Sequence, residues 1–290
     1  MDKLISGLSE KRLFNIAFSL IVGEGNWMER DYYNILLEDK LYIRVSDDNP
    51  IKLQNHDNYN GEKAEFLFRA LIEHNPNYPF YWFGLAICRG HIPYYDAWYI
   101  GDQDEIIELL SKAIQLLDDH PTFYYYRAIA FRHKEEYENS IEDYEKTIFL
   151  DDKYVDAYID LAWIYRFSKN DYKNAIEVIS RLIEIFPNEH KYFSKRADIS
   201  LEFRKYSNAI QDYSTAITKS RAAQYDMNSI EGNECGNLFN IAVCKEKIGD
   251  FSGALSDVES VLWACEYYSP QFIDSARSLK DKLSKVVITP

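Results

Sequence analysis

The chain has 290 residues, of which 47% are hydrophobic and 28% are charged, a composition typical of folded proteins rather than of disordered chains. Its formal net charge is −14, and a surface this acidic repels phosphate backbones, which argues against general nucleic-acid binding. Only 11 Gly and 8 Pro are present, too few for the many turns of a β-sandwich or barrel, whereas Tyr is abundant at 24 residues.

The first 60 residues carry the least regular pattern of the chain. Residues 9–37 contain two helical patterns that suit a degenerate helical repeat, and “KLYIRVSDDNPIKL” alternates around a turn, which suits a short hairpin. The apolar run in “KRLFNIAFSLIVGEG” resembles a signal peptide. Acidic residues precede it, polar residues interrupt it and no A-x-A site follows, so the pattern favours a buried helix.

The cysteines and the hydropathy indicate in which cellular compartment the protein is expected. Cys88, Cys235, Cys244 and Cys265 form no C-x-x-C pair and have no zinc-ligand spacing to a histidine, so we expect reduced thiols that are mostly buried. No stretch reaches the roughly 18 apolar residues that a membrane span needs. We therefore expect a cytoplasmic protein without a membrane segment.

Helical patterns become clear after residue 60. Residues 64–76 carry an apolar stripe that ends in a proline, and Trp82-x-x-Leu85-Ala86 begins the next helix. Ala64 and Ile106 occupy the same position in successive second helices but lie 42 residues apart, about eight more than one repeat requires. The inserted residues fall in the aromatic-rich segment 91–100, which we expect to brace the array rather than to serve as a contact site.

One phrase then recurs four times. It opens on an aromatic residue, at Tyr137, Tyr172, Tyr206 and Phe251, so the steps are 35, 34 and 45 residues. Apolar residues continue at helical spacing and place one stripe on one helix face. A small residue three positions after each aromatic lets a neighbouring helix approach closely; these residues are Ser140, Ala175, Ala209 and Ala254.

A second pattern precedes each phrase and predicts another helix. Its clearest form is Tyr158-x-x-Leu161-Ala162-x-x-Tyr165, and looser forms begin at Tyr124, Phe193 and Leu238. Each unit is therefore helix, turn, helix. The turns fall at “HKEE”, “SKND”, “EFRK” and “KIGD”.

A 34-residue period with these residue types resembles the tetratricopeptide-repeat family over roughly residues 45–268. The resemblance implies an all-α, right-handed α-solenoid of about five to six helix-turn-helix repeats. We expect an N-terminal region at 1–60, an array at 61–268 and a C-terminal capping helix at 269–290, whose polar back would close the last apolar face. The expected units are 79–120, 121–154, 155–189, 190–223 and 235–268.

No catalytic or metal-binding constellation is present in the sequence. Nucleotide-binding glycine loops, H-E-x-x-H and G-x-S-x-G are absent, so we expect no catalytic residue, no metal and no cofactor. Acidic pairs such as Asp118–Asp119 and Asp151–Asp152 recur where units join and suit a solvated surface.

What remains is a surface. In stacked helical pairs the first helices line the concave side. Helical spacing places aromatic and basic residues on the face of these helices that packing leaves open. Such a surface suits a concave groove that binds a peptide or helix. The alternative is that these aromatic residues pack between adjacent first helices. The predicted groove residues are Tyr125, Tyr126, Ile129, Arg132, Ile159, Trp163, Arg166, Phe167, Lys191, Lys195, Phe239 and Asn240.

One branch of the family holds the acidic C-terminus of heat-shock chaperones in a clamp of basic and asparagine residues. Lys191 and Lys195 match the last part of that clamp. Asp160 stands where the clamp requires Asn, and Tyr125 and Ile129 stand where it requires Lys and Asn. The clamp is therefore broken, and its ligand is not carried over.

These patterns predict a non-catalytic protein-interaction module, an adaptor or assembly scaffold that binds a peptide or helix segment, acidic or aromatic, of another protein. A chaperone-type holdase or co-chaperone is the alternative, and an enzyme with its site in the first 60 residues is a distant one. We expect no nucleic-acid or membrane partner, and homo-oligomers are compatible with the pattern.

Overall fold

The computed structural model of the chain describes residues 10–22, 61–90, 101–222, 227–264 and 270–287. Over these residues the regular structure consists of thirteen α-helices and one π-helical turn, and no strand is present. Most of the described helices pack mainly against the next described helix along the chain, as helical repeats do. The predicted all-α helical-repeat fold is confirmed. The hairpin expected near residue 50 and the segment 91–100 lie outside the described residues.

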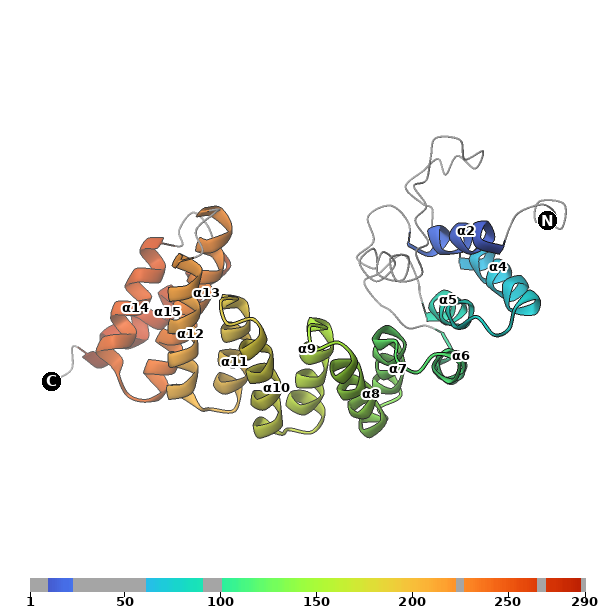
Figure 1. Cartoon of the computed structure of the whole chain (residues 1–290). Coiled ribbons are helices and arrows are strands. Elements are labelled where there is room, and N and C mark those ends of the chain that lie inside the picture. Colours follow the sequence, from blue (N-terminus) through green and yellow to red (C-terminus); the bar gives the residue numbers. More distant parts are fainter. Residues whose placement is uncertain (1–9, 23–60, 91–100, 223–226, 265–269, 288–290) are drawn as a thin grey trace. The chain divides into compact units, whose positions relative to one another are not determined.

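The chain divides into two compact units, residues 1–157 and 158–290 (Figure 1). The division falls within α9 (Val155–Trp163). Before α9, the first unit contains α2 (Glu10–Val22), α4 (Gly61–His74), α5 (Pro79–Gly90), α6 (Gln103–Leu116), α7 (Pro121–His133) and α8 (Tyr137–Leu150). After α9, the second unit contains the π-helical turn η1 (Ile164–Ser168), α10 (Tyr172–Ile185), α11 (His190–Glu202), α12 (Tyr206–Ala222), α13 (Met227–Lys247), α14 (Phe251–Ala264) and α15 (Pro270–Val287).

Small residues set the close approach of paired helices, as the spacing predicts. Ser140, Ala175, Ala209 and Ala254 are each 0% exposed. The Ser140 hydroxyl donates a hydrogen bond of 2.7 Å to the carbonyl of Ala128 on the partner helix. A second helix can reach the backbone of the first only where its side chain is this small.

The four predicted turns between first and second helices are present. Each contains one residue in the left-handed region: Glu135, Asn170, Arg204 or Gly249, with φ of 60°, 50°, 58° and 85°. In three of the turns, the following N–H bonds to the carbonyl five residues earlier and closes the end of the first helix. These bonds run from Glu136 to Phe131, from Lys205 to Ser200 and from Asp250 to Lys245.

Helix α2 docks on α4 and α5 through aromatic and polar contacts. Phe14 and Phe18 are buried, and their ring centroids lie 6.3 and 5.2 Å from that of Phe68. Glu10 accepts a hydrogen bond of 2.5 Å from the Tyr81 hydroxyl. Helix α2 therefore takes the place of a first helix paired with α4, a role that the sequence pattern left open.

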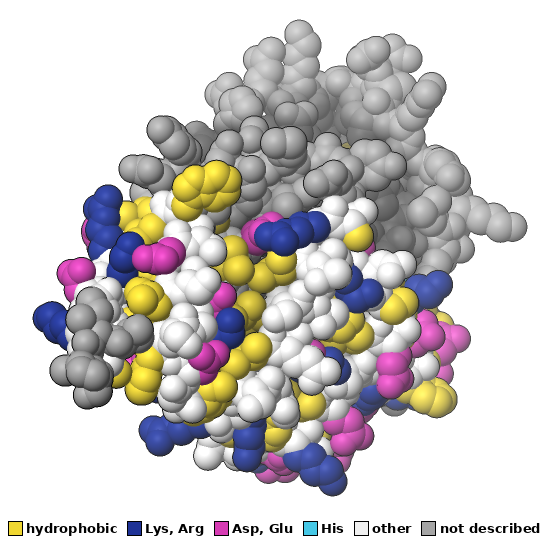
Figure 2. Space-filling model, turned by 90° about the vertical axis from the view of Figure 1, so that its left-hand side faces the viewer, with side chains coloured by type: hydrophobic (Ala, Val, Ile, Leu, Met, Phe, Trp, Pro, Cys, Tyr) yellow, Lys and Arg dark blue, Asp and Glu magenta, His cyan; other side chains and the backbone are white. Residues whose placement is uncertain are grey.

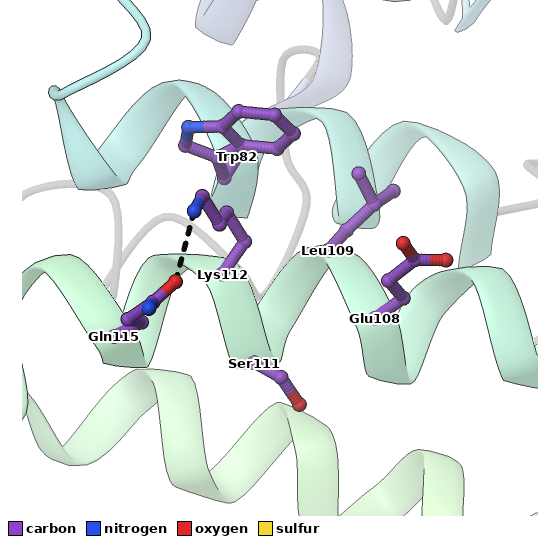
Figure 3. Close-up of a pocket in the computed structure, with 6 residues that line it drawn as sticks. All are labelled: Trp82, Glu108, Leu109, Ser111, Lys112 and Gln115. Atoms are coloured by element: carbon purple, nitrogen blue, oxygen red, sulfur yellow. Dashed lines mark hydrogen bonds between the residues drawn. The ribbon is translucent and has the colours of Figure 1, made fainter.

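An open hollow of about 480 Å³ lies between α5 and α6 in the first unit (Figure 3). Trp82 borders it from α5, while Leu109 and Lys112 border it from α6. The Trp82 indole N–H donates to the carbonyl of Pro76 at 2.8 Å, and the Lys112 ammonium donates to Gln115 at 2.8 Å. Of its lining side chains, Lys112 and Gln115 bond to each other, and Ser111 accepts a hydrogen bond from Arg127 of α7.

The C-terminal helix α15 covers the last helical pair. The apolar stripe of α15 lies in one buried cluster with the core face of α14; the residues are Ile273, Ala276, Leu279 and Leu283 of α15 and Ala254, Val258 and Val261 of α14. Figure 2 shows the face on which α14 and α15 lie. Hydrophobic side chains appear there in short runs broken by charged and other polar groups.

Helix α13 and the cysteines differ from the sequence-based expectation. The helix begins at Met227, so residues 227–234, which precede the expected last unit, extend its first helix. Cys88 and Cys244 are free and buried, as expected. Cys235 is disulfide-bonded, so the prediction of a reduced thiol is wrong at that position; Cys265 lies outside the described residues.

Candidate functional site

The predicted groove residues of the first unit are mostly buried. Tyr125, Tyr126 and Ile129 are only 7%, 2% and 6% exposed. The Tyr125 ring lies 4.9 Å from that of Tyr154 and 5.8 Å from that of Tyr144, measured between centroids. For these three residues the structure favours the packing interpretation, because a neighbouring tyrosine covers the face that the spacing left open.

Two basic residues, Arg132 and His133, lie in the last turn of helix α7. Arg132 is half-buried, and the side chain of His133 is buried only in part. Partial burial of the imidazole, together with the charge of Arg132, lowers the pKa of His133 to about 4. His133 is therefore neutral at physiological pH, and Arg132 supplies the positive charge at this helix end.

The second unit places an exposed aromatic pair at its predicted groove positions. Trp163 is 41% exposed and Phe167 is 50% exposed, and their ring centroids are 5.3 Å apart. The guanidinium of Arg166 stands 4.4 Å from the Phe167 centroid, within the range of a cation–π interaction. Arg166 also forms an ion pair with Glu202 of α11. This contact ties the aromatic pair to the next first helix.

The aromatic pair lies on a backbone irregularity. The N–H of Lys169 bonds to the carbonyl of Ile164 at 3.0 Å, an i→i+5 bond that defines the π-helical turn η1. The N–H of Asp171 then bonds to the carbonyl of Tyr165, six residues back, where the other three turns span five. The first helix of this unit therefore ends with one residue more than its counterparts.

The sequence contains the cause of this irregularity. The second-helix aromatic follows the first-helix anchor by 13 residues in three units, Tyr124 to Tyr137, Phe193 to Tyr206 and Leu238 to Phe251. The separation is 14 residues from Tyr158 to Tyr172. An extra residue inside a packed helix is accommodated as a π-turn, because the flanking α-helical turns then keep their register. The 35-residue step held this signal, but it did not show where the extra residue goes.

A partly buried hydrogen-bond chain links α11, α12 and α13. The Asn240 amide donates to the Tyr213 hydroxyl at 3.0 Å, and that hydroxyl donates to Asp198 at 2.5 Å. Burial raises the pKa of Asp198, although the hydrogen bond from Tyr213 and the charges of Arg166 and Lys195 lower it. The chain joins α11, α12 and α13 and fixes the Asp198 carboxyl in place. Sequence reasoning missed it, because Tyr213 reads only as a core residue.

Two lysines stand one helical turn apart on α11. Lys191 and Lys195 are exposed, and the Lys191 ammonium lies 3.8 Å from Glu189 and 5.0 Å from the Tyr192 ring centroid. The ammonium of Lys195 makes no hydrogen bond or ion pair with the described residues. Their spacing of four places both charges on the same side of the helix.

The remaining predicted groove residues of the second unit are half-buried. Ile159 lies on α9, and Phe239 and Asn240 lie on α13. Phe239 packs against the core cluster of α13, α14 and α15.

We call the surface formed by Trp163, Arg166, Phe167, Lys191 and Lys195 the first-helix face. Among the described residues no group of three or more metal-ligating side chains occurs, and none of the described helices combines the length and apolarity that crossing a membrane requires.

Comparison with known proteins agrees with this architecture. Residues 155–189 match a family model described as tetratricopeptide repeat. These residues form the unit that contains η1. No curated protein matches the sequence.

Solved structures match over much of the chain at low identity. The C-terminal part of a TPR repeat-containing protein from Cytophaga hutchinsonii is 14% identical, with a TM-score of 0.62 over 89% of each chain. YrrB, described as a TPR protein with an unusual peptide-binding site, is 14% identical, with a TM-score of 0.51 over 75% of this chain and 97% of its own. The Naa15/Naa10 complex bound to HypK-THB gives a TM-score of 0.54 at 13% identity, over 96% of this chain and 34% of that one. At these identities the likeness is one of fold.

Residues 155–189 therefore carry a tetratricopeptide repeat, and the described helical pairs share the fold of solved tetratricopeptide-repeat proteins. Proteins built on this repeat generally serve as protein-interaction modules.

Proposed function

We propose that the chain is a non-catalytic adaptor or assembly scaffold that binds a peptide or helix of another protein on its first-helix face. The observation that carries the proposal is the exposure of Trp163 and Phe167, at 41% and 50%, beside the guanidinium of Arg166. Exposed aromatic groups next to an arginine have the composition of binding hot spots. A purely solvated helix face has no physical reason to carry them.

The fold and one structural relative support a peptide-binding role. Stacked helical pairs present an extended surface of first helices, and YrrB, which shares the fold, is described by its peptide-binding site. The polar groups behind the face suit support rather than catalysis, because Asp198 and Tyr213 bond to each other. The proposal therefore assigns no chemical step to the chain.

The proposed partner is a protein, and the proposed compartment is the cytoplasm. A net charge of −14 disfavours nucleic acid as the partner. The bonded Cys235 is the observation that opposes a reducing compartment. Alkylation of the protein in fresh cell lysate, followed by intact mass measurement, counts the thiols that are free in the cell. A bonded Cys235 there would move the proposal to an oxidising compartment.

Affinity capture tests the binding role. The wild-type chain and Trp163→Ala are immobilised and exposed to lysate of the source cells, with Trp263→Ala as the control because Trp263 is 86% exposed on α14, outside the face. Capture of one partner that Trp163→Ala loses and Trp263→Ala keeps supports an adaptor. Equal capture by all three chains, or weak capture of many unrelated chains, contradicts it, and the second pattern indicates a holdase.

A further inference from the structure

In two successive repeats a basic side chain of the second helix covers the anchor, the large residue that opens the first-helix pattern. The ammonium of Lys146 lies 5.7 Å from the ring centroid of Tyr124. The guanidinium of Arg181 lies 5.4 Å from the ring centroid of Tyr158. Both distances are within the range of a cation–π interaction. The two rings are only 8% and 2% exposed, so each of these anchors is covered and faces a cation of its own chain.

Trp82 is the anchor of the expanded repeat, and its ring lacks this cover. Lys112 occupies the position of Lys146 and Arg181, two residues after a buried residue of the second helix. Its ammonium donates to Gln115 at 2.8 Å instead (Figure 3). Trp82 is half-buried, and its ring makes no aromatic or cation–π contact with the described residues. The hollow of about 480 Å³ therefore borders an aromatic ring where other repeats place a cation.

The polar groups that line the hollow favour a positively charged ligand. The Trp82 indole N–H is taken by the carbonyl of Pro76, and Ser111 accepts a hydrogen bond from Arg127. Glu108 is exposed at the border of the hollow and forms no hydrogen bond or ion pair with the described residues. An anion would meet both this carboxylate and the negative face of the indole ring, whereas a cation is attracted by both.

The helix that forms one wall of the hollow carries mostly negative charge. Residues 101–120, which contain α6, hold six acidic residues and one basic residue, Lys112. Asp104 and Glu105 are neutralised by ion pairs with basic residues of other helices. The other four acidic residues form no ion pair with the described residues. On a chain with a net charge of −14, this wall attracts a cationic segment.

We propose that the hollow between α5 and α6 binds an arginine side chain from a basic segment of a partner protein. The guanidinium stacks on the Trp82 ring, the Glu108 carboxylate supplies the opposite charge, and the methylene stem packs on Leu109. Arginine fits better than lysine, because a planar guanidinium stacks on aromatic faces and an ammonium does not. This site goes beyond the proposed function, because it lies in the first unit and the first-helix face lies in the second.

Peptide titration tests the chemistry of the ligand. Three fluorescein-labelled peptides of equal length are titrated with the full chain by fluorescence anisotropy: one of Arg and Ser, one with Lys in place of each Arg, and one with citrulline in place of each Arg. The Arg peptide should bind roughly threefold or more tightly than the Lys peptide, and the uncharged citrulline peptide should bind least. Equal affinity for the Arg and citrulline peptides would overturn the charge assignment, and equal affinity for Arg and Lys would overturn the stacking.

Trp82→Leu tests the aromatic ring. Leucine stands at the same position in the last repeat, as Leu238, so the variant should keep its helical circular dichroism. Its affinity for the Arg peptide should fall roughly threefold or more, because the cation–π contact is lost. Trp263→Leu is the control, because Trp263 is 86% exposed and lies outside the hollow. A folded Trp82→Leu variant with wild-type affinity, or equal losses in the two variants, would overturn the site.

Glu108→Gln tests the carboxylate and does not disturb the core. Glu142 is the matched control, because it is exposed at the same position of the next second helix, where Lys146 already covers the anchor ring. Glu108→Gln should weaken binding of the Arg peptide more at low salt than at high salt, and Glu142→Gln should have little effect at either. Equal effects would mean that the overall acidic charge, and not the hollow, holds the peptide.

Variants of Lys112 and Gln115 test the competition between the ligand and the chain's own cation. Gln115→Leu removes the acceptor of the Lys112 ammonium, which can then cover the Trp82 ring, so affinity for the Arg peptide should fall. Lys112→Leu removes the basic charge at the hollow, so affinity should rise. The reverse result in both variants would make Lys112 part of the binding site and the ligand an anion, which would overturn the proposal.

The site and the proposed function fail separately. If Trp82→Leu and Glu108→Gln leave Arg-peptide binding unchanged while Trp163→Ala abolishes partner capture, the hollow is not a site and the proposed function stands. If both hollow variants lose the Arg peptide and Trp163→Ala captures its partner normally, the hollow is a site and the first-helix face is not.

Discussion

Arg127 of α7 donates two hydrogen bonds, of 2.7 and 2.8 Å, to Asp143 of α8 and a third, of 3.0 Å, to Ser111 of α6. The second unit repeats the arrangement in full. Arg196 donates to Asp212 at 2.8 and 2.7 Å and to Ser180 at 2.9 Å. In both cases the serine, the arginine and the aspartate are 16 residues apart, so one repeated geometry links three successive helices.

The repeat between these two arrangements, residues 155–189, has apolar residues in place of both the arginine and the aspartate. The position of the arginine holds Leu161, and the position of the aspartate holds Val178, which are 0% and 3% exposed. A charged pair and an apolar pair therefore exchange as pairs at the same place. This follows from the cost of burial: a half-buried charge is tolerated with its partner and is costly without it.

Substitutions at Arg196 and Asp212 test this exchange. Asp212→Val alone should lower the free energy of unfolding by about 3 kcal/mol or more, because it leaves the guanidinium partly buried without its carboxylate. Arg196→Leu combined with Asp212→Val copies the intervening unit and should recover most of the loss. Urea denaturation measures both variants. A double variant that is less stable than the single one would show that the two pairs are not interchangeable.

Overpacking tests the repeat register. Ala209 is 0% exposed where α12 meets α11, and Leu at this position should cost about 1–3 kcal/mol of unfolding free energy. Ser207→Leu is the matched control, because Ser207 is exposed on the same helix. Calorimetry should show a lower melting temperature for Ala209→Leu alone. An unchanged melting temperature would mean that the helices do not approach at this residue.

Removal of the C-terminal helix tests its capping role. Deletion of residues 269–290 exposes Val258 and Val261, which are each 0% exposed beneath α15. The shortened chain should self-associate at micromolar concentration, because the last pair then presents an apolar face to water. Light scattering measures the association. A truncated chain that stays monomeric and as stable as the full chain would make α15 a dispensable tail.

The fold could be predicted from the sequence because its determinants are local. The spacing of Tyr137, Ser140 and Tyr144 places one apolar stripe on one helix face, whatever lies beyond it. Small residues such as Ala175 mark where helices touch. These features depend on side-chain size and helical period alone, and both are written in the chain.

The exposure of the candidate site residues could be predicted only in part, because it depends on contacts between neighbouring helices. Trp163, Arg166 and Phe167 were placed on the outer face of a first helix, where the structure exposes the two aromatic rings. Tyr125 was placed there too, but Tyr154 packs against it. Which flank a neighbour covers depends on the spacing between helices, which no single helical pattern contains. The Arg166–Glu202 pair was missed for the same reason.

The imidazole of His133 predicts a pH dependence of stability. Partial burial lowers its pKa in the folded chain to about 4, below the ordinary value of 6.5. Below about pH 6.5 the unfolded chain therefore binds a proton that the folded chain does not, and stability is lost as the pH falls towards 4. The His133→Asn variant should lose less melting temperature than the wild type between about pH 7 and pH 5. Parallel losses in the two proteins would assign the acid sensitivity to other groups.

Exchanging the charges of Arg166 and Glu202 tests their roles in stability and in binding separately. Arg166→Glu places two carboxylates together and should cost about 1 kcal/mol or less, because the pair is partly exposed. Adding Glu202→Arg restores the pair with reversed polarity, so the melting temperature should recover. Capture of the partner from lysate should not recover, because residue 166 no longer carries the guanidinium that stacks on Phe167. The same swap at Arg221 and Glu234, an ion pair outside the first-helix face, is the control and should leave partner capture unchanged. Recovery of both stability and binding in the Arg166–Glu202 swap would show that the pair only braces α11 and that the cation–π contact has no part in recognition.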